Sequence, residues 1–203
     1  MLASKEELEL SLKIFEGEFL PYYLSLDEQV AETNRYVSIR SDNRKAYSLE
    51  YSKLLQTICG EIDVFAKALC NLGDPSLKPK DLNIQKWGIR LQDLFPAIET
   101  EFVRVEGYGE LKPWANWRYE YYRDKNDVKR IRLIQGKSTP IWWAAYNKVK
   151  HERTMLRPDK SLHFEKANQG NVIRALAALY ILESLYLREA SAPENIQSHI
   201  FVI

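Results

Sequence analysis

The sequence has few of the side chains that build disulfides or metal sites. Its 203 residues include two cysteines, Cys59 and Cys70, and three histidines. If both cysteines lie on one helix, they are about 16 Å apart along its axis, which is beyond the reach of a disulfide. The sequence also lacks the glycine patterns of phosphate-binding and dinucleotide-binding loops and the HExxH pattern of zinc peptidases. We therefore expect two reduced core cysteines, no metal site and no bound cofactor.

Long apolar runs and a large net charge are also lacking. The first ten residues, MLASKEELEL, have no apolar centre, so we expect no signal peptide. The longest apolar stretch, VIRALAALYILESLYL, is broken by Arg174 and Glu183 and falls short of the roughly 18 apolar residues that span a bilayer. The formal net charge is only +1. We expect a soluble, cytoplasmic protein in which any anionic partner meets a local patch rather than a global field.

The spacing of apolar residues predicts a mainly α-helical bundle in one domain spanning 1–203. A long helix is expected from about 44 to 72, a shorter one over 83–95, a third from Pro140 to about 154, and a last long helix over about 165–189. An amino-terminal helix should end or kink at Pro21. The seam of the 44–72 helix recurs at steps of three and four: Tyr51, Leu55, Ile58, Ile62, Phe65 and Leu69.

Residues 100–138 interrupt the helical pattern and are expected to form a small insertion within the domain. EFVRVEGYGE (101–110) suits a β-hairpin, and RDKNDVKRIRLIQGK (123–137) suits a basic loop or ribbon. RYVSI (35–39) alternates briefly and could form a short strand. Residues 191–203 are expected to form a loose carboxyl-terminal tail.

The stretch WWAAYNKVKHER (142–153) concentrates aromatic and charged residues on one predicted helix. At about 100° per residue, one face carries Trp142, Ala145, Val149 and Leu156. The opposite face carries Trp143, Asn147, Lys150, His151 and Thr154, with Tyr146 and Arg153 on a flank between the two faces. In a purely structural interpretation, Trp143 packs under the hairpin and the cations stabilise the carboxyl end of the helix. That interpretation does not explain why Asn147, a poor helix former, stands within the helix.

Glu61 lies at the edge of the apolar stripe on the 44–72 helix. A partly desolvated carboxylate needs a cationic or hydrogen-bonding partner. We therefore predict that Glu61 pairs with Lys150, His151 or Arg153 inside the bundle.

A resemblance to a known family rests on three segments. The helix carrying YSLEYSKLLQTICGEIDVFAKAL, then WWAAYNKVKHER, then NVIRALAALYILESLYL together resemble bacterial HEPN-like helical domains, a superfamily of ribonucleases and nucleotide-binding proteins. Members are helical bundles, often dimeric, and many cleave RNA without metal. Their motif is an Arg, often followed by Asn, with a His four to six residues after the Arg. Asn147 and His151 fit this motif, whereas Tyr146 stands at the Arg position. A second formal match, Arg157 with His163, lies in a loop after a proline and is treated as coincidence.

The resemblance assigns roles to the residues of this stretch. His151 would be the catalytic base or acid, Lys150 and Arg153 would bind phosphate, and Asn147 would orient His151. Supporting positions would be Glu61, Tyr146 and Trp143. A Tyr cannot supply a permanent positive charge. We therefore expect a homodimer that binds RNA, a nucleotide or another phosphate-bearing ligand weakly and cleaves RNA slowly or not at all, in a setting such as defence or a toxin–antitoxin pair.

Two alternatives stay open. One is a metal-independent endoribonuclease that uses His151, and the other is a purely structural, dimerising interaction protein.

A second surface suited to single-stranded nucleic acid is predicted in the 100–138 region, through phosphate contacts and base stacking. It combines upstream tyrosines with the basic residues Lys129, Arg130, Arg132 and Lys137.

Overall fold

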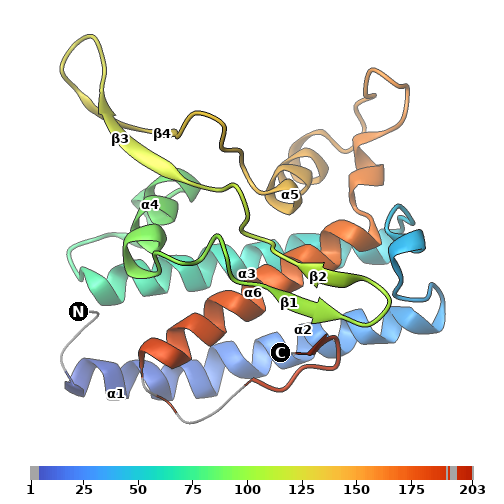
Figure 1. The fold of residues 1–203 in the computed structure, drawn as a ribbon, viewed down its shortest axis with the longest axis horizontal. Helices are drawn as coiled ribbons and strands as arrows, with labels where there is room; N and C mark the ends of the chain where they lie inside the picture. The colour runs from blue at the N-terminus through green and yellow to red at the C-terminus, as the bar shows by residue number, and fades with distance from the viewer. Residues whose placement is uncertain (1–4, 191, 193–195, 203) are drawn as a thin grey trace.

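A computed structural model describes residues 5–190, 192 and 196–202, which form a mainly helical fold with two small antiparallel sheets (Figure 1). This confirms the predicted fold class at the level of a helical bundle. The α-helices are α1 (Lys5–Ile14), α2 (Leu20–Glu32), α3 (Leu49–Gly73), α4 (Ile84–Leu94), α5 (Ile141–Glu152) and α6 (Gln169–Glu189). The strands are β1 (Val103–Val105), β2 (Gly109–Leu111), β3 (Tyr119–Arg123), β4 (Lys129–Leu133) and β5 (Phe201–Val202).

The amino-terminal helix does not end at Pro21. A π-helical segment, Phe15–Phe19, connects α1 directly to α2, and Pro21 lies in the first turn of α2. A proline lacks the backbone N–H and its ring collides with the carbonyl four residues earlier. The wider π turn changes the hydrogen-bond register just before the proline, so that the helix continues.

Helices α3 and α6 pack against each other through the middle of the molecule, with α2 along one side and α4 and α5 on the other (Figure 1). The predicted seam of α3 is buried at every position. The apolar residues at helical spacing on α6 are buried as well: Val172, Ala175, Leu176, Leu179, Leu182 and Tyr186. Helix α3 starts at Leu49 rather than near residue 44, because the Ser48 side chain accepts the N–H of Tyr51 and caps the helix. Asn168 caps α6 in the same way.

The two cysteines and helix α6 are core elements. Cys59 and Cys70 are free and buried, and burial raises the pKa of both thiols, that of Cys70 to about 12. Within the described chain, α6 is the one helix long and apolar enough to cross a membrane. Most of its apolar stretch is buried inside the protein, as in the core helix of a soluble domain. Among the described residues no group of three or more His, Cys, Asp or Glu side chains could hold a metal ion.

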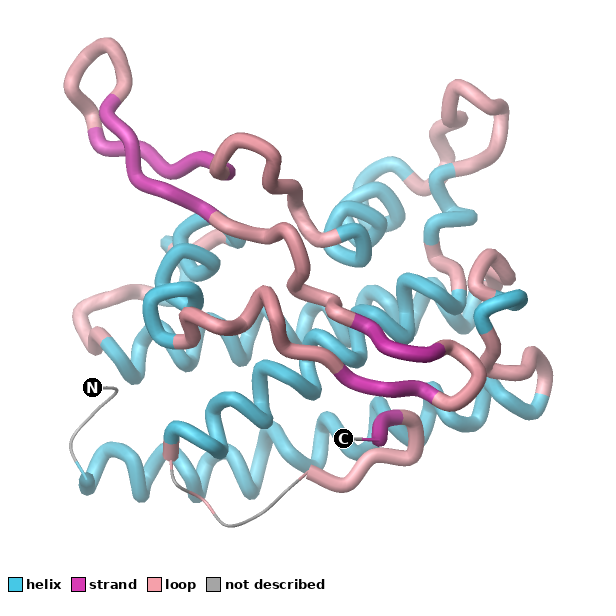
Figure 2. Tube along the Cα trace, viewed as in Figure 1, coloured by secondary structure: helices cyan, strands magenta, loops and turns pink. Residues whose placement is uncertain are grey.

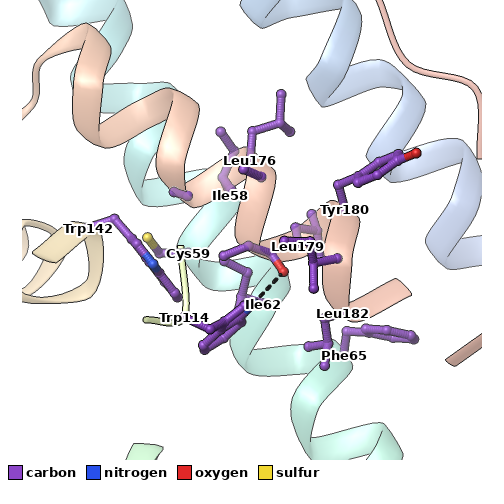
Figure 3. Close-up of a cluster of buried hydrophobic side chains, with 14 of the residues drawn as sticks. Ile58, Cys59, Ile62, Phe65, Trp114, Trp142, Leu176, Leu179, Tyr180 and Leu182 are labelled. Atoms are coloured by element: carbon purple, nitrogen blue, oxygen red, sulfur yellow. Dashed lines mark hydrogen bonds between the residues drawn. The ribbon is translucent and has the colours of Figure 1, made fainter. Parts of the chain in front are cut away.

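Five tryptophans form a cluster that joins the 100–138 region to the helices: Trp87, Trp114, Trp117, Trp142 and Trp143. Trp114 and Trp142 lie against α3 and α6 in Figure 3, and Trp114 Nε1 donates to the carbonyl of Ala178 at 3.1 Å. Gly88 of α4 lets the cluster close, since a Cβ there would lie 2.6 Å from Trp117 Cζ2. The tryptophans of the 100–138 region are therefore part of the main core.

The strands form two separate sheets (Figure 2). Strands β1 and β2 form the predicted hairpin, and β5 adds to the other edge of β1. Strands β3 and β4 form the predicted ribbon, which projects away from the helices. RYVSI (35–39) contains no strand, because its backbone carbonyls at Val37 and Ser38 accept from the Gln169 side chain instead.

The carboxyl-terminal residues differ from the predicted loose tail. Residues 191, 193–195 and 203 lie outside the described residues, but 196–202 pack on the domain. Ile196, Ile200 and Phe201 are buried, and Phe201 lies in strand β5. These buried apolar side chains and the hydrogen bonds that the segment makes to Asp27 of α2 hold it in place.

Candidate functional site

Helix α5 carries the aromatic and charged stretch, and its buried face is largely as predicted. Trp142, Ala145 and Val149 are buried. Leu156 is 65 % exposed, contrary to prediction, because α5 ends at Glu152 and the chain turns away. Trp143 was predicted on the polar face but is buried, with its ring 5.6 Å from that of Trp87 on α4.

Tyr146 and Lys150 are brought together beside α3. Lys150 Nζ donates to Tyr146 Oη at 3.0 Å. The pKa of the Lys150 ammonium is raised, first by that hydrogen bond and also by the charge of Asp63. Asp63 in turn accepts from Trp87 Nε1 at 3.0 Å and pairs with Lys67. The carboxylate of α3 that faces α5 is therefore Asp63.

The predicted pairing of Glu61 with Lys150, His151 or Arg153 is wrong. Glu61 makes no ion pair among the described residues. It lies near Glu183 of α6, whose pKa is raised by burial and, in second place, by the charge of Glu61. Burial raises the pKa of Glu61 itself. Two residues along a helix correspond to a rotation of about 200°, so Glu61 faces α6 where Asp63 faces α4 and α5.

Replacement of Glu61 by Gln should therefore leave stability unchanged or raise it slightly. The substitution removes a charge near another carboxyl and breaks no ion pair, so the free energy of unfolding should change by no more than about 0.5 kcal/mol. Asp63→Asn is the matched comparison and should cost about 1–2 kcal/mol, because it weakens the bonds to Trp87 and Lys67. Urea denaturation of both variants measures the difference. A clear loss of stability in Glu61→Gln alone would restore the pairing that the sequence suggested.

The remaining predicted site residues do not form a cluster. Asn147, His151 and Arg153 are exposed, and among the described residues their side chains share no hydrogen bond or ion pair with one another. On the same helix Glu152 pairs with Lys148 at 2.7 Å. The imidazole nearest to that carboxylate is His163, 3.9 Å away.

A basic pocket of about 500 Å³ lies between the start of α5, the loop after it and the start of α6. Its five basic side chains come from three separate parts of the sequence: Arg44, Lys45, Arg157, Lys166 and Arg174. Two carboxylates, Asp159 and Glu165, also line it. No sequence pattern predicts this pocket. Arg157 stands out in the sequence only through a coincidental motif match, and no local pattern connects residue 44 with residue 174.

Most of the positive charge in the basic pocket is not neutralised by the protein. Arg157 pairs with Asp159 at 3.2 Å. The other four cations form no ion pair with a described carboxylate, although Arg174 Nη1 donates to the Gly170 carbonyl at 2.9 Å. The positive end of the α6 dipole adds to this field. The pocket is thus a ready site for an anion.

Backbone contacts fix the loop that carries Arg44. The Gly170 N–H donates to the Arg44 carbonyl at 3.0 Å, and the Gln169 N–H donates to the Ala46 carbonyl at 2.9 Å. A Cβ on Gly170 would lie 3.0 Å from the Arg44 oxygen, so a glycine allows this close approach. The first N–H groups of α6 are therefore already used, and an anion would be held by the side chains.

Comparison of the chain with models of protein families, with curated proteins and with solved structures finds no match. The assignment of a function therefore rests on the geometry of the molecule itself.

Proposed function

We propose that the protein binds RNA or another phosphate-bearing ligand through the basic pocket. The observation that carries this proposal is the set of four basic side chains there without ion-pair partners: Arg44, Lys45, Lys166 and Arg174. Guanidinium and ammonium groups are the usual protein partners of phosphate oxygens. The phosphate-binding residues thus differ from Lys150 and Arg153, which the resemblance to HEPN-like domains implied.

The size and lining of the basic pocket support a nucleotide unit as the bound group. A cavity of about 500 Å³ lies within the range of about 300–1,000 Å³ typical of small-molecule sites. Ile141 and Ala144 form an exposed apolar edge. Such an edge suits the face of a base while the cations hold the phosphate.

The β3–β4 ribbon gives weaker support as a second contact surface. Arg130 pairs with Asp124 at 3.1 Å and Arg132 pairs with Glu120 at 2.8 Å. Lys129 Nζ lies 3.8 Å from the centre of the Tyr121 ring, so that ring is already covered on one face. These internal contacts leave less charge and less aromatic surface for a nucleic acid than the sequence alone suggests.

The proposal assigns no catalytic role to the residues of α5. Tyr146, at the position of the motif Arg, is buried and bonded to Lys150, and His151 is exposed on its own. The HEPN-like relationship and the homodimer stay predictions. Light scattering at several protein concentrations tests the dimer, for which a mass near twice 23.8 kDa is expected.

Neutralising the basic pocket should weaken RNA binding. Replacing Arg44 and Lys166 together by Ala is expected to lower affinity for a fluorescent single-stranded RNA by roughly tenfold, equivalent to about 1.4 kcal/mol. The matched control is Lys78→Ala with Lys80→Ala, which removes the same charge from exposed positions between α3 and α4. Fluorescence anisotropy measures both. Equal affinity of the two double variants would contradict the assignment to this pocket.

A further inference from the structure

A buried carboxylate on α2, that of Asp27, contacts the exposed imidazole of His199 in the carboxyl-terminal segment. Asp27 of α2 is fully buried and accepts four hydrogen bonds. Its Oδ1 accepts from Ser198 Oγ at 2.6 Å and Tyr23 Oη at 3.3 Å. Its Oδ2 accepts from the His199 backbone N–H at 2.5 Å and lies 2.9 Å from His199 Nδ1. The His199 side chain is 66 % exposed.

This arrangement orients the proton of the neutral imidazole. A carboxylate only accepts hydrogen bonds, so Nδ1 must carry the proton that faces Asp27. Nε2 is then the free acceptor, and it makes no hydrogen bond to any described residue. The ring cannot turn without breaking its bond to a buried carboxylate, which is the arrangement that prepares a histidine for general-base catalysis.

His199 lines an open, polar groove of about 550 Å³ together with Arg40, Glu106, Asn34, Ser38 and Gly107. Arg40 is exposed and pairs with no described carboxylate, so its guanidinium is free to hold an anion. Glu106 places one negative charge in the same groove and disfavours a dianion. One cation and one carboxylate together suit a substrate with a single negative charge, such as a phosphodiester.

We propose that this groove is a hydrolytic site for phosphodiesters, in which His199 is the general base and Asp27 is its positioning residue. Arg40 holds a non-bridging phosphate oxygen. A water molecule gives a proton to His199 Nε2 and its oxygen bonds to phosphorus. The bond from phosphorus to the leaving oxygen breaks. The imidazolium then gives its proton to the leaving oxygen of an alcohol, or to solvent water when the leaving group departs as a phenolate, and the neutral imidazole is restored. The products are a phosphomonoester and an alcohol or phenol. This site does not depend on the basic pocket.

The test incubates the full chain with bis(p-nitrophenyl) phosphate and measures the rate at which p-nitrophenolate is released. Removing a general base typically costs 10²–10⁴-fold, so His199→Gln should lose at least about 100-fold in kcat. Asp27→Asn should lower kcat with little change in KM, and Arg40→Gln should raise KM. Lys78→Ala with Lys80→Ala, the exposed pair between α3 and α4, is the control and should keep full activity.

The outcomes separate this site from the RNA-binding proposal. Because His199 is exposed, its Gln variant should fold, and its melting temperature checks this. Hydrolysis no faster than buffer, or equal rates for the wild type and His199→Gln, overturns the proposal. RNA affinity of the same His199→Gln protein should stay at the wild-type level, so loss of binding is not the reason for any loss of hydrolysis.

Discussion

Replacing Trp114 by Ala is expected to lower the free energy of unfolding by about 3–5 kcal/mol. The Trp114 side chain has no exposed surface, and its ring lies 4.7 Å from Trp117 and 5.1 Å from Trp142, centre to centre. Its Nε1–H satisfies the carbonyl of Ala178 on α6. The substitution would remove two ring contacts and one hydrogen bond, and it would leave a cavity between the 100–138 region and the central helices.

Urea denaturation followed by circular dichroism measures this loss. The comparison is Tyr121→Ala, which truncates an aromatic side chain that is 46 % exposed on the β3–β4 ribbon. That variant should lose less than about 1 kcal/mol, because little buried surface changes. Similar losses in the two variants would mean that the 100–138 region does not contribute to the core.

Replacing Glu183 by Met is expected to raise the free energy of unfolding by about 1–3 kcal/mol at neutral pH. Glu183 has no exposed surface, and neither carboxylate oxygen has a hydrogen-bond partner among the described residues. Burial, and then the charge of Glu61, raise the pKa of Glu183 well above its usual range. Methionine fills a similar volume without a buried polar group.

The pH dependence of this gain follows from the direction of the shift. A carboxyl whose pKa is raised in the folded state lowers the free energy of unfolding least at pH values below its unfolded pKa, which is near 4.5. The stability of the wild type is therefore lost progressively as the pH rises from there toward the folded pKa. The advantage of Glu183→Met should be small near pH 4.5 and larger at pH 7.5. A variant less stable than the wild type at pH 7.5 would show that Glu183 has a stabilising partner.

The helices could be predicted because their information is local. The buried seams of α3 and α6 follow from residue spacing alone. The predicted starts of α3 and α6 lie a few residues too early. Ser48 and Asn168 stand within sequence that is compatible with a helix, and they set the start of each helix only through their capping hydrogen bonds. The carboxyl-terminal strand could not be predicted, because β5 depends on the distant strand β1 and on Asp27.

The candidate sites could be predicted only in part, because they depend on which faces of the helices meet. The sequence predicts Glu61 as the partner of α5 residues, and only the packing shows that Asp63 faces Lys150 instead. The basic pocket combines the loop before α3 with the start of α6, more than a hundred residues later. The bond between Asp27 and His199 spans 172 positions. No periodicity or short motif encodes such pairings.

The most direct test of the central claim is the salt dependence of RNA binding by the unmodified protein. Fluorescence anisotropy should follow a labelled single-stranded RNA across a series of salt concentrations. Each phosphate contact to a single strand contributes about −0.7 to the slope of log affinity against log salt. The four basic side chains of the pocket that lack ion pairs therefore predict a slope near −3. Absence of binding at low salt, or an affinity that does not change with salt, would contradict the proposal that this protein binds a phosphate-bearing ligand.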